Sequence, residues 1–422
     1  MDIIANYGNV LIILAIVFGT FMAWGIGAND VANAMGTSVG SGAVTIKQAI
    51  IIAVIFEFSG AILAGGEVTA TIRKGILDAA LFTNDPHLLV YGMMASLLAA
   101  GSWLLIASSF GWPVSTTHSI VGAIVGFGAV GVGVDAVAWG KVIKIVISWI
   151  ASPVLAGIIS FTLFRSLQNL IIDTHDPFNN AKKYVPYYMF LVGFIVSLVT
   201  IFKGLKHVGL SFSTSTSYLL SLGFGLLVAI IGTLMIRNIH LDPDENIDFH
   251  FTSMERVFGV LMIITAAAMA FAHGSNDVAN AIGPLAAIYS VIESGGAIGS
   301  KSALPLWILL VGGAGIVVGL VTYGHRVIAT IGTGITQLTP SRGFAATLAA
   351  AATVVIASGT GIPVSTTQVL VGAVLGVGLA RGMAALDTRV INRIFLSWIV
   401  TLPAGALMSI LFFFALKGAF GA

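Results

Sequence analysis

Long apolar segments separated by short polar ones recur along almost the whole chain. Each apolar segment has about the 20 residues that a helix needs to cross the hydrocarbon core of a bilayer. Strands of a membrane β-barrel would instead alternate apolar and polar residues. The apolar pattern predicts spans near residues 8–35, 46–66, 88–110, 111–134, 138–165, 185–202, 214–236, 254–283, 303–324, 343–360, 362–380 and 390–416. The sequence therefore predicts an all-α polytopic membrane protein with about twelve transmembrane helices.

Composition supports a membrane protein and excludes several functions. Of the 422 residues, 57% are hydrophobic and 9% are charged, whereas soluble domains carry roughly 25% charged residues. The net charge of +2 comes from scattered residues without a polybasic arm, so we expect no nucleic-acid partner. The absence of cysteine excludes disulfides, thiolate metal ligands and cysteine nucleophiles. No basic region precedes the first apolar run, so we interpret that run as a span of the mature protein and not as a signal peptide.

Three short motifs occur twice in the same order. The sequence GANDVANA returns as GSNDVANA, PVSTT returns unchanged, and SWI returns unchanged. The first copies begin at Gly27, Pro113 and Ser148, and the second copies begin at Gly274, Pro363 and Ser397. The offsets of 247, 250 and 249 residues agree so closely that the two halves are one duplicated unit.

The repeat predicts the domain organisation and the topology. Residues 1–166 form the first transmembrane repeat, residues 167–253 form two linking spans with a short acidic connector, and residues 254–422 form the second repeat. Five spans in each repeat with two between them place the copies in opposite orientations, as in transporters with inverted repeats. Lys and Arg are more numerous on the side opposite the termini, so the positive-inside rule favours both termini outside a prokaryotic inner or plasma membrane.

The repeated Asn-Asp cluster predicts a cation site. A carboxylate inside a bilayer is costly and needs a partner or a function. Asp30 and Asn33, like Asp277 and Asn280, are three residues apart and therefore share one helix face. Hard oxygen ligands suit sodium better than a soft metal. The candidate sodium ligands are Asp30, Asp277, Asn29, Asn276, Asn33 and Asn280. We expect the glycines around each cluster, and Pro284, to break the helix and free its carbonyls.

The repeated PVSTT motif predicts an anion site. In each copy Gly-x-Pro ends one apolar helix, and three hydroxyl residues fill the first turn of the next. A helix N-terminus offers free N–H donors and a partial positive charge. Two half-helices entering from opposite faces would meet near the midplane around one tetrahedral oxyanion. The candidate anion contacts are Ser115, Thr116, Thr117, Ser365, Thr366 and Thr367, with Asn33, Asn280 and Gln368.

These motifs resemble those of the inorganic phosphate transporter (PiT) family, whose members carry both clusters in each half. The segments FEFSG with Glu57 and TIRKG with Arg73 and Lys74 also look like family segments. The resemblance covers almost the whole chain, although the long central cytosolic domain of eukaryotic members is absent. It implies a substrate and cation site at Asp30, Asn33, Ser115, Thr116, Asp277, Asn280, Ser365 and Thr366.

We therefore expect a sodium-coupled symporter that imports inorganic phosphate by alternating access, with cations binding first and no enzymatic activity. Sodium ions are the coupling ions, and no other cofactor is expected. Within the same family, proton-coupled symport, metal-phosphate symport and sulfate transport remain open. So does a passive anion channel, although channels seldom place acidic residues beside an anion path. Membrane lipids surround the protein, and assembly into a homo-oligomer stays open.

Three other polar residues within the spans carry alternative interpretations. Glu57 has no aligned counterpart, so coupling, gating and a structural carboxylate remain open for it. His118 beside Ser115 would suit an intramembrane hydrolase, but the second copy has Gln368 at the equivalent position. His273 stands where the first copy has Ile26, and we assign it no function.

Overall fold

The computed structural model describes residues 3–240, 250–298, 304–325, 328, 338–382 and 388–421. The acidic part of the predicted connector, residues 241–249, lies outside this range. The helices of the first half are α1 (Ile3–Gly40), α2 (Ile46–Ala64), α3 (Gly66–Lys74), α4 (Pro86–Ser109), α5 (Thr116–Phe127) and α6 (Trp139–Leu167). They are followed by α7 (Pro177–Phe202), α8 (Thr214–Arg237), α9 (His250–Glu293), α10 (Leu306–Gly319), α12 (Pro340–Gly359), α13 (Thr366–Arg381) and α14 (Thr388–Phe420).

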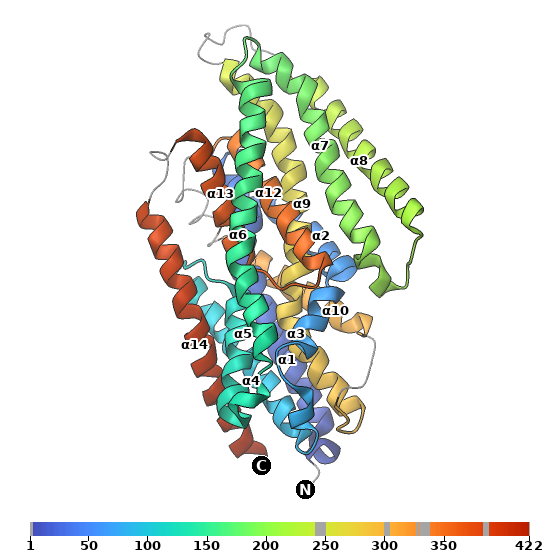
Figure 1. Cartoon of the computed structure of the whole chain (residues 1–422), viewed down its shortest axis with the longest axis vertical. Helices are drawn as coiled ribbons and strands as arrows, with labels where there is room; N and C mark the ends of the chain where they lie inside the picture. Colours follow the sequence, from blue (N-terminus) through green and yellow to red (C-terminus); the bar gives the residue numbers. More distant parts are fainter. Residues whose placement is uncertain are drawn as a thin grey trace.

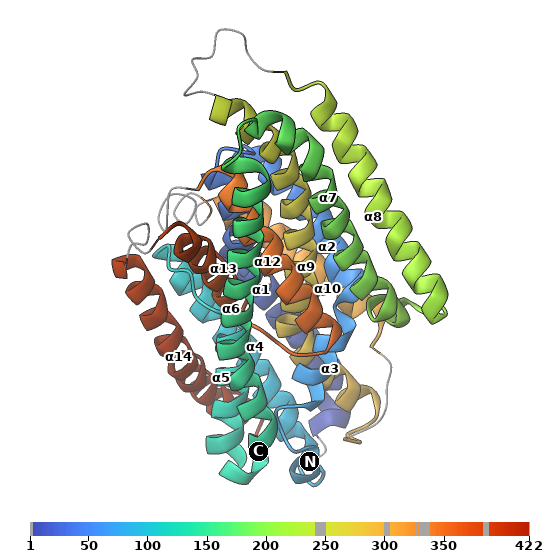
Figure 2. The same ribbon diagram turned by 45° about the horizontal axis from the view of Figure 1, so that its top comes forward.

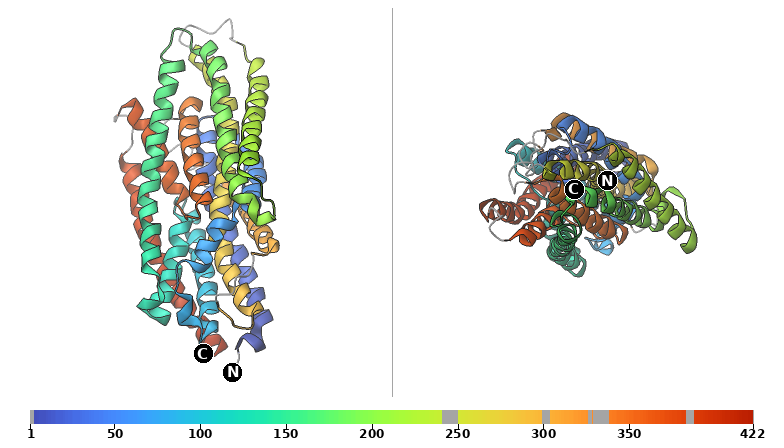
Figure 3. Two further views of the ribbon diagram at one scale, coloured as in Figure 1. Left: turned by 45° about the vertical axis from the view of Figure 1, so that its right-hand side comes forward. Right: turned by 90° about the horizontal axis from the view of Figure 1, so that it is seen from above.

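Within the described residues, ten helices are long and apolar enough to cross a membrane, and two more apolar helices are shorter. The short ones are Thr116–Val132 and Thr366–Arg381, which are the two segments that follow the PVSTT prolines. Each of the twelve predicted spans corresponds to one of these helices. Most helices run along the long axis of the molecule (Figure 3), and the predicted all-helical membrane fold is confirmed.

Two helical hairpins face each other across the middle of the bundle. Figure 1 shows α4 and α5 in its lower half and α12 and α13 in its upper half. Each hairpin packs into a different apolar cluster, which includes Phe127 around α5 and Phe344 around α12, and both clusters also contain residues of α1 and α9. The chain passes from one arm of each hairpin to the other through a glycine in the left-handed region, Gly111 with φ +65° and Gly361 with φ +72°. The predicted half-helices therefore begin near the middle of the bundle.

The long helices α1 and α9 pack against each other through the centre, whereas α7 and α8 form a peripheral pair. Figure 2 shows α8 at the edge of the bundle. The side of α8 that faces α7 carries small residues such as Ser221, Gly225 and Gly232, which are buried. Small residues allow helices to approach closely where both neighbours and lipid are apolar.

The expectation that helices break at the Asn-Asp clusters is wrong. Both α1 and α9 run unbroken through their clusters, and Pro284 lies inside α9. The glycines have a different purpose, because a Cβ atom at Gly27 would collide with the Ile316 carbonyl oxygen of α10. A Cβ atom at Gly274 would likewise collide with the Glu57 carbonyl oxygen of α2. These glycines let neighbouring backbones touch and do not free carbonyl groups.

Candidate functional site

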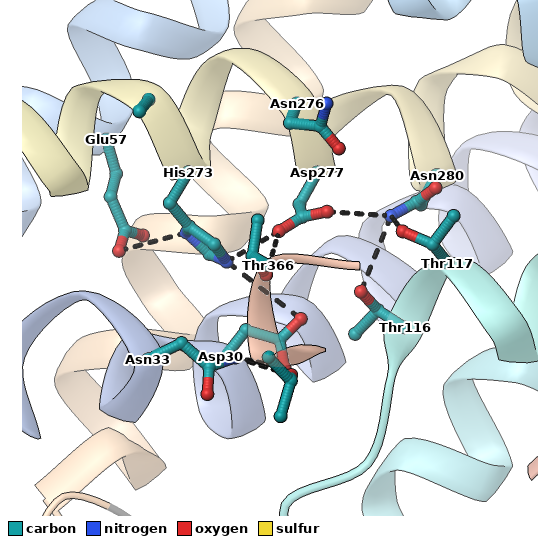
Figure 4. A network of polar contacts seen from close by, with 12 residues as sticks. Asp30, Asn33, Glu57, Thr116, Thr117, His273, Asn276, Asp277, Asn280 and Thr366 are labelled. Atoms are coloured by element: carbon teal, nitrogen blue, oxygen red, sulfur yellow. Dashed lines mark hydrogen bonds and ion pairs between the residues drawn. The ribbon is translucent and has the colours of Figure 1, made fainter. Parts of the chain in front are cut away.

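The two aspartates meet at the contact between α1 and α9. Asp30 and Asp277 are fully buried, and each offers a carboxylate oxygen within 4.8 Å of the other and of a ring nitrogen of His273. Two carboxylates this close in a medium of low dielectric constant repel each other strongly unless positive charge lies between them. The structure brings Asp30 and Asp277 together with Asn33 and Asn280 in one buried network (Figure 4).

The asparagines that follow the aspartates connect each half to the other. Asn33 Nδ2 donates to Thr367 Oγ1 at 2.8 Å, and Asn280 Nδ2 donates to Thr117 Oγ1 at 3.2 Å. Each Nδ2 also donates to the aspartate of its own cluster, Asp30 or Asp277. The cation cluster of one half is thus hydrogen-bonded to the hydroxyl triplet of the other half.

The hydroxyl triplets begin α5 and α13 as predicted. Ser115 and Ser365 are the N-caps, and their Oγ atoms accept hydrogen bonds from the backbone N–H groups of His118 and Gln368. A short polar N-cap of this kind stabilises the start of a helix. The amides of the first two residues of each helix, Thr116 and Thr117 in α5 and Thr366 and Thr367 in α13, have no acceptor within the helix, because the first helical turn leaves its N–H groups unsatisfied. These amides and the helix dipole make each helix start suitable for an anion.

The two helix starts also bond directly to each other. Thr117 Oγ1 donates to the Val364 carbonyl at 3.0 Å, and Thr367 Oγ1 donates to the Val114 carbonyl at 3.3 Å. In addition, Thr366 Oγ1 donates to Asp277 Oδ2 at 2.8 Å. Both anion half-sites and both aspartates therefore belong to one connected network.

The first asparagine of each cluster is anchored at the end of a hairpin arm. Asn29 Nδ2 donates to Ser108 Oγ at 2.9 Å and to the Trp112 carbonyl at 3.1 Å. Asn276 Nδ2 repeats this arrangement, with Ser358 Oγ at 3.2 Å and the Ile362 carbonyl at 3.5 Å. In both residues Nδ2 is occupied, so the carbonyl oxygen Oδ1 is the atom left for another ligand.

Several buried oxygens of the cluster have no hydrogen-bond donor among the described residues. They are Asn29 Oδ1, Asp30 Oδ2, Asn276 Oδ1 and Asn280 Oδ1. A buried acceptor without a partner costs free energy, and a cation coordinated by these oxygens would remove that cost. Glu57 Oε1 and Oε2 are also buried without a hydrogen-bond donor among the described residues, so the unpartnered oxygens extend beyond the residues that the sequence predicts as cation ligands.

Two residues outside the predicted ligand set join the cluster. His273 Nε2 lies 2.9 Å from Asp277 Oδ2 and 3.9 Å from Asp30 Oδ2, and Nδ1 lies 3.2 Å from Glu57 Oε1. Sequence analysis assigns His273 no function and leaves Glu57 open. The one signal available in the sequence is that the duplication fails at His273, where the first copy has Ile26.

Gln368 and His118 line a different space from the aspartate cluster. They lie on an apolar groove of about 780 Å³ between α6, α13 and α14, together with Trp149 and Trp398. The His118 ring lies against Trp149, with 3.9 Å between ring centroids. His118 is therefore part of an aromatic contact, and only its backbone N–H meets the Ser115 hydroxyl.

Comparisons with known proteins agree with this arrangement. A model of the Phosphate transporter family matches residues 26–409. A putative phosphate permease of Haemophilus influenzae is 54% identical over 420 residues and is matched over the full length of both chains. The chloroplastic inorganic phosphate transporter 2-1 of Arabidopsis thaliana is 44% identical over 414 residues, which cover 94% of this chain and 70% of that protein.

A solved structure described as the sodium-dependent phosphate transporter has the same fold. The TM-score is 0.89 at 40% sequence identity, and the match covers 97% of this chain and 99% of that chain. The match to the family model and the match to the solved structure each extend over nearly the whole molecule. The range matched by the family model includes both hairpins and both Asn-Asp clusters. The chain therefore belongs to the phosphate transporter family and is a multi-pass membrane transporter, not an enzyme.

Proposed function

We propose that this protein imports inorganic phosphate together with sodium by alternating access around the buried cluster. The observation that carries the proposal is the cross-half network, in which Asn33 bonds to Thr367 and Asn280 bonds to Thr117. This network connects oxygen ligands for a cation to helix starts that suit an anion. The solved relative is described as sodium-dependent, which supports sodium as the coupling ion.

In this proposal the cations bind between the aspartates. Asp30, Asp277, Asn29, Asn276, Asn33 and Asn280 supply the oxygens, and the unpartnered buried atoms are the ones that would face the ions. Hard cations prefer such oxygen ligands. Bound cations would neutralise the aspartates before phosphate arrives, since an anion beside two bare carboxylates would be repelled.

Phosphate would bind where α5 and α13 begin. Ser115, Thr116 and Thr117 of one half and Ser365, Thr366 and Thr367 of the other surround this point. The hydroxyls of Thr117 and Thr367 already donate to carbonyl groups, so we assign the main phosphate contacts to the first-turn backbone amides. Asn33 and Asn280 lie between the aspartates and the hydroxyl triplets, because each is hydrogen-bonded to both. Gln368, which follows the second triplet, remains a predicted phosphate contact.

Uptake of labelled phosphate into proteoliposomes tests this proposal. The purified protein is given an inward sodium gradient, an inward proton gradient or neither, with sulfate as a competitor in parallel samples. We expect accumulation with the sodium gradient and little competition from sulfate. Accumulation that follows the proton gradient and ignores sodium would overturn sodium coupling, and strong competition by sulfate would overturn phosphate as the preferred anion.

One observation favours a second candidate, metal-phosphate symport. Asp30, His273 and Asp277 together present one imidazole nitrogen and two carboxylate oxygens within 4.8 Å of one another. A site with an imidazole and two carboxylates suits divalent ions such as zinc or manganese better than it suits sodium. Uptake of labelled phosphate that requires manganese and continues without sodium would select this candidate.

We further propose that both termini face the outside of a cell membrane. The ends of α1 and α14 lie at the same end of the bundle (Figure 1), and the distribution of Lys and Arg favours the opposite end as the cytoplasmic one. Labelling of a single cysteine introduced near Phe420 by a membrane-impermeant maleimide tests the orientation, because the chain contains no native cysteine. Labelling in intact cells is expected, and labelling only after lysis would reverse the orientation.

A further inference from the structure

The two helix crossings beside the aspartates, α1 with α10 and α9 with α2, differ in the residues that fill them. Close glycine contacts identify equivalent positions at the two crossings. At the crossing of α1 with α10 these contacts join Gly27 to the Ile316 carbonyl and Gly319 to the Trp24 carbonyl, and at the crossing of α9 with α2 they join Gly274 to the Glu57 carbonyl and Gly60 to the Phe271 carbonyl. The contact positions on α9 follow those on α1 by 247 residues in both cases, and the contact positions on α10 follow those on α2 by 259 residues in both cases. These constant offsets show which residues of the two crossings are equivalent.

This equivalence pairs two polar residues with two apolar ones. His273 corresponds to Ile26, and Glu57 corresponds to Ile316. All four residues are fully buried. Because two isoleucines fill the crossing of α1 with α10, packing alone does not require a glutamate and a histidine at the crossing of α2 with α9. A buried ionisable pair within a membrane is costly, so its presence at one of the two crossings indicates a function.

The polar pair holds one aspartate more firmly than the other. Asp277 Oδ2 lies 2.9 Å from His273 Nε2 and also accepts the Thr366 hydroxyl, while Oδ1 accepts Asn280 Nδ2. Asp30 Oδ1 accepts Asn33 Nδ2. Its Oδ2 has no hydrogen-bond donor among the described residues and lies 3.9 Å from His273. The two carboxylates are equivalent in sequence, but their surroundings differ.

We propose that Glu57 and His273 form a positioning pair that makes the two cation half-sites unequal. Glu57 holds His273, and His273 holds Asp277, so the Asp277 carboxylate is directed to the imidazole as well as to a cation. Asp30, whose Oδ2 lies 3.9 Å from His273 Nε2 whereas Asp277 Oδ2 lies 2.9 Å from it, is held less closely and forms the half-site that takes the first cation. The inference rests on the proposed sodium coupling, and it assigns an order to the two aspartates that the repeated sequence does not contain.

Sodium-induced stabilisation of the purified protein tests the inequality without requiring transport. A ligand that binds only the folded state raises Tm in proportion to the logarithm of its concentration over Kd. We expect Asp30→Asn to abolish the sodium-dependent rise in Tm at low sodium, and Asp277→Asn to retain most of it. Equal losses in the two variants would overturn the inference.

A symmetrised variant tests the role of the pair itself. Glu57→Ile with His273→Ile gives the second crossing the residues that already pack at the first. We expect this double variant to fold, and the difference between Asp30→Asn and Asp277→Asn to disappear in its background. We also expect its half-saturating sodium concentration to fall about tenfold. Without His273, sodium no longer competes with the imidazole for the Asp277 carboxylate, and that contact has about the strength of a hydrogen bond to a charged group.

Single variants and a control complete the test. His273→Ile alone leaves Glu57 buried without its partner and is expected to fold less stably than the double variant. The control, Ile26→Leu with Ile316→Leu, changes the equivalent apolar crossing and should preserve the unequal response. An unequal response that persists in the symmetrised variant would overturn the role of the pair. If sodium neither raised the Tm of the wild-type protein nor drove its phosphate uptake, the proposed function would be overturned instead.

Discussion

The two repeated motifs solve different chemical problems with different backbones. The Asn-Asp clusters lie inside α1 and α9, which are unbroken, whereas the PVSTT motifs lie where α5 and α13 begin. Side-chain oxygens can reach a cation from a complete helix. Backbone N–H groups become available for an anion only where a helix starts. The comparison teaches that the break between helices in this fold belongs to the half of the site that we propose for the anion.

Glycine follows the same division. Gly27 and Gly274, beside the clusters, sit in regular helix and permit close contact with the backbones of α10 and α2. Gly111 and Gly361, before the PVSTT motifs, have positive φ and end a helix. One residue type thus supports packing in one motif and termination in the other.

The largest effect is expected from removing a carboxylate of the cation cluster. Asp30→Ala should lower sodium-driven phosphate uptake roughly 100-fold, because it removes an ionised partner from a buried charged network. Uptake into proteoliposomes at fixed sodium measures the loss. The matched control is Asp135→Ala, which changes an exposed aspartate in a connecting segment and should leave uptake unchanged. Equal losses of uptake in the two variants would contradict a specific role of the aspartate cluster in sodium-driven uptake.

Next in size is the effect of adding a methyl group where the backbones touch. Gly27→Ala should lower the free energy of unfolding by about 1–3 kcal/mol, because the new Cβ collides with the Ile316 carbonyl. Thermal unfolding in detergent measures the change. Gly259→Ala in α9 is the control, since no atom lies within 4 Å of its added Cβ. A hinge at Gly27 would predict comparable stability in the two variants, and that result would contradict the packing role.

Phosphate affinity should depend more on a backbone amide than on a hydroxyl. Thr116 is the first residue of α5, a position where proline is structurally tolerated but lacks an N–H. Thr116→Pro should raise the KM for phosphate about tenfold, as expected for losing a hydrogen bond to a charged group. Thr116→Val keeps the N–H and should change KM less. The reverse order would assign phosphate binding to the hydroxyl.

The smallest effect is expected at the serines that anchor the first asparagines. Ser108→Ala removes the hydrogen bond that fixes Asn29 Nδ2 and should raise the half-saturating sodium concentration by roughly threefold to fivefold, the value of one ordinary hydrogen bond. The adjacent Ser109, whose hydroxyl donates to the Leu105 carbonyl of its own helix and not to Asn29, provides the control as Ser109→Ala. A similar rise in the half-saturating sodium concentration in Ser109→Ala would mean that the hydrogen bond between Ser108 and Asn29 does not affect sodium binding.

Patterns within one segment predicted much of this architecture. Apolar segments predicted the ten long and two shorter apolar helices found among the described residues, because the bilayer imposes its thickness on the sequence, whereas the short helix α3 was not predicted. Gly-x-Pro followed by hydroxyl residues predicted the two helix starts, since those residue types have local backbone preferences. The repeated order of motifs predicted that both halves contribute to one site.

Contacts between distant helices could not be predicted in the same way. The role of Gly27 depends on the α10 backbone, and nothing in the local sequence separates a glycine that breaks a helix from one that admits a neighbour. The contact of His273 with Glu57 joins residues 216 positions apart on α9 and α2. Local patterns carry no register between helices, so this pair required the three-dimensional structure.

The exchange of hydrogen bonds between the halves has an evolutionary consequence. Asn33 finds its hydroxyl partner in the second copy, and Asn280 finds its partner in the first. Before the duplication was fused, a single copy would have carried half of each bond and completed neither. A single copy could complete this network only by pairing with a second copy in the opposite orientation, and fusion into one chain makes that pairing permanent while each copy keeps residues of its own, such as His273 and Ile26.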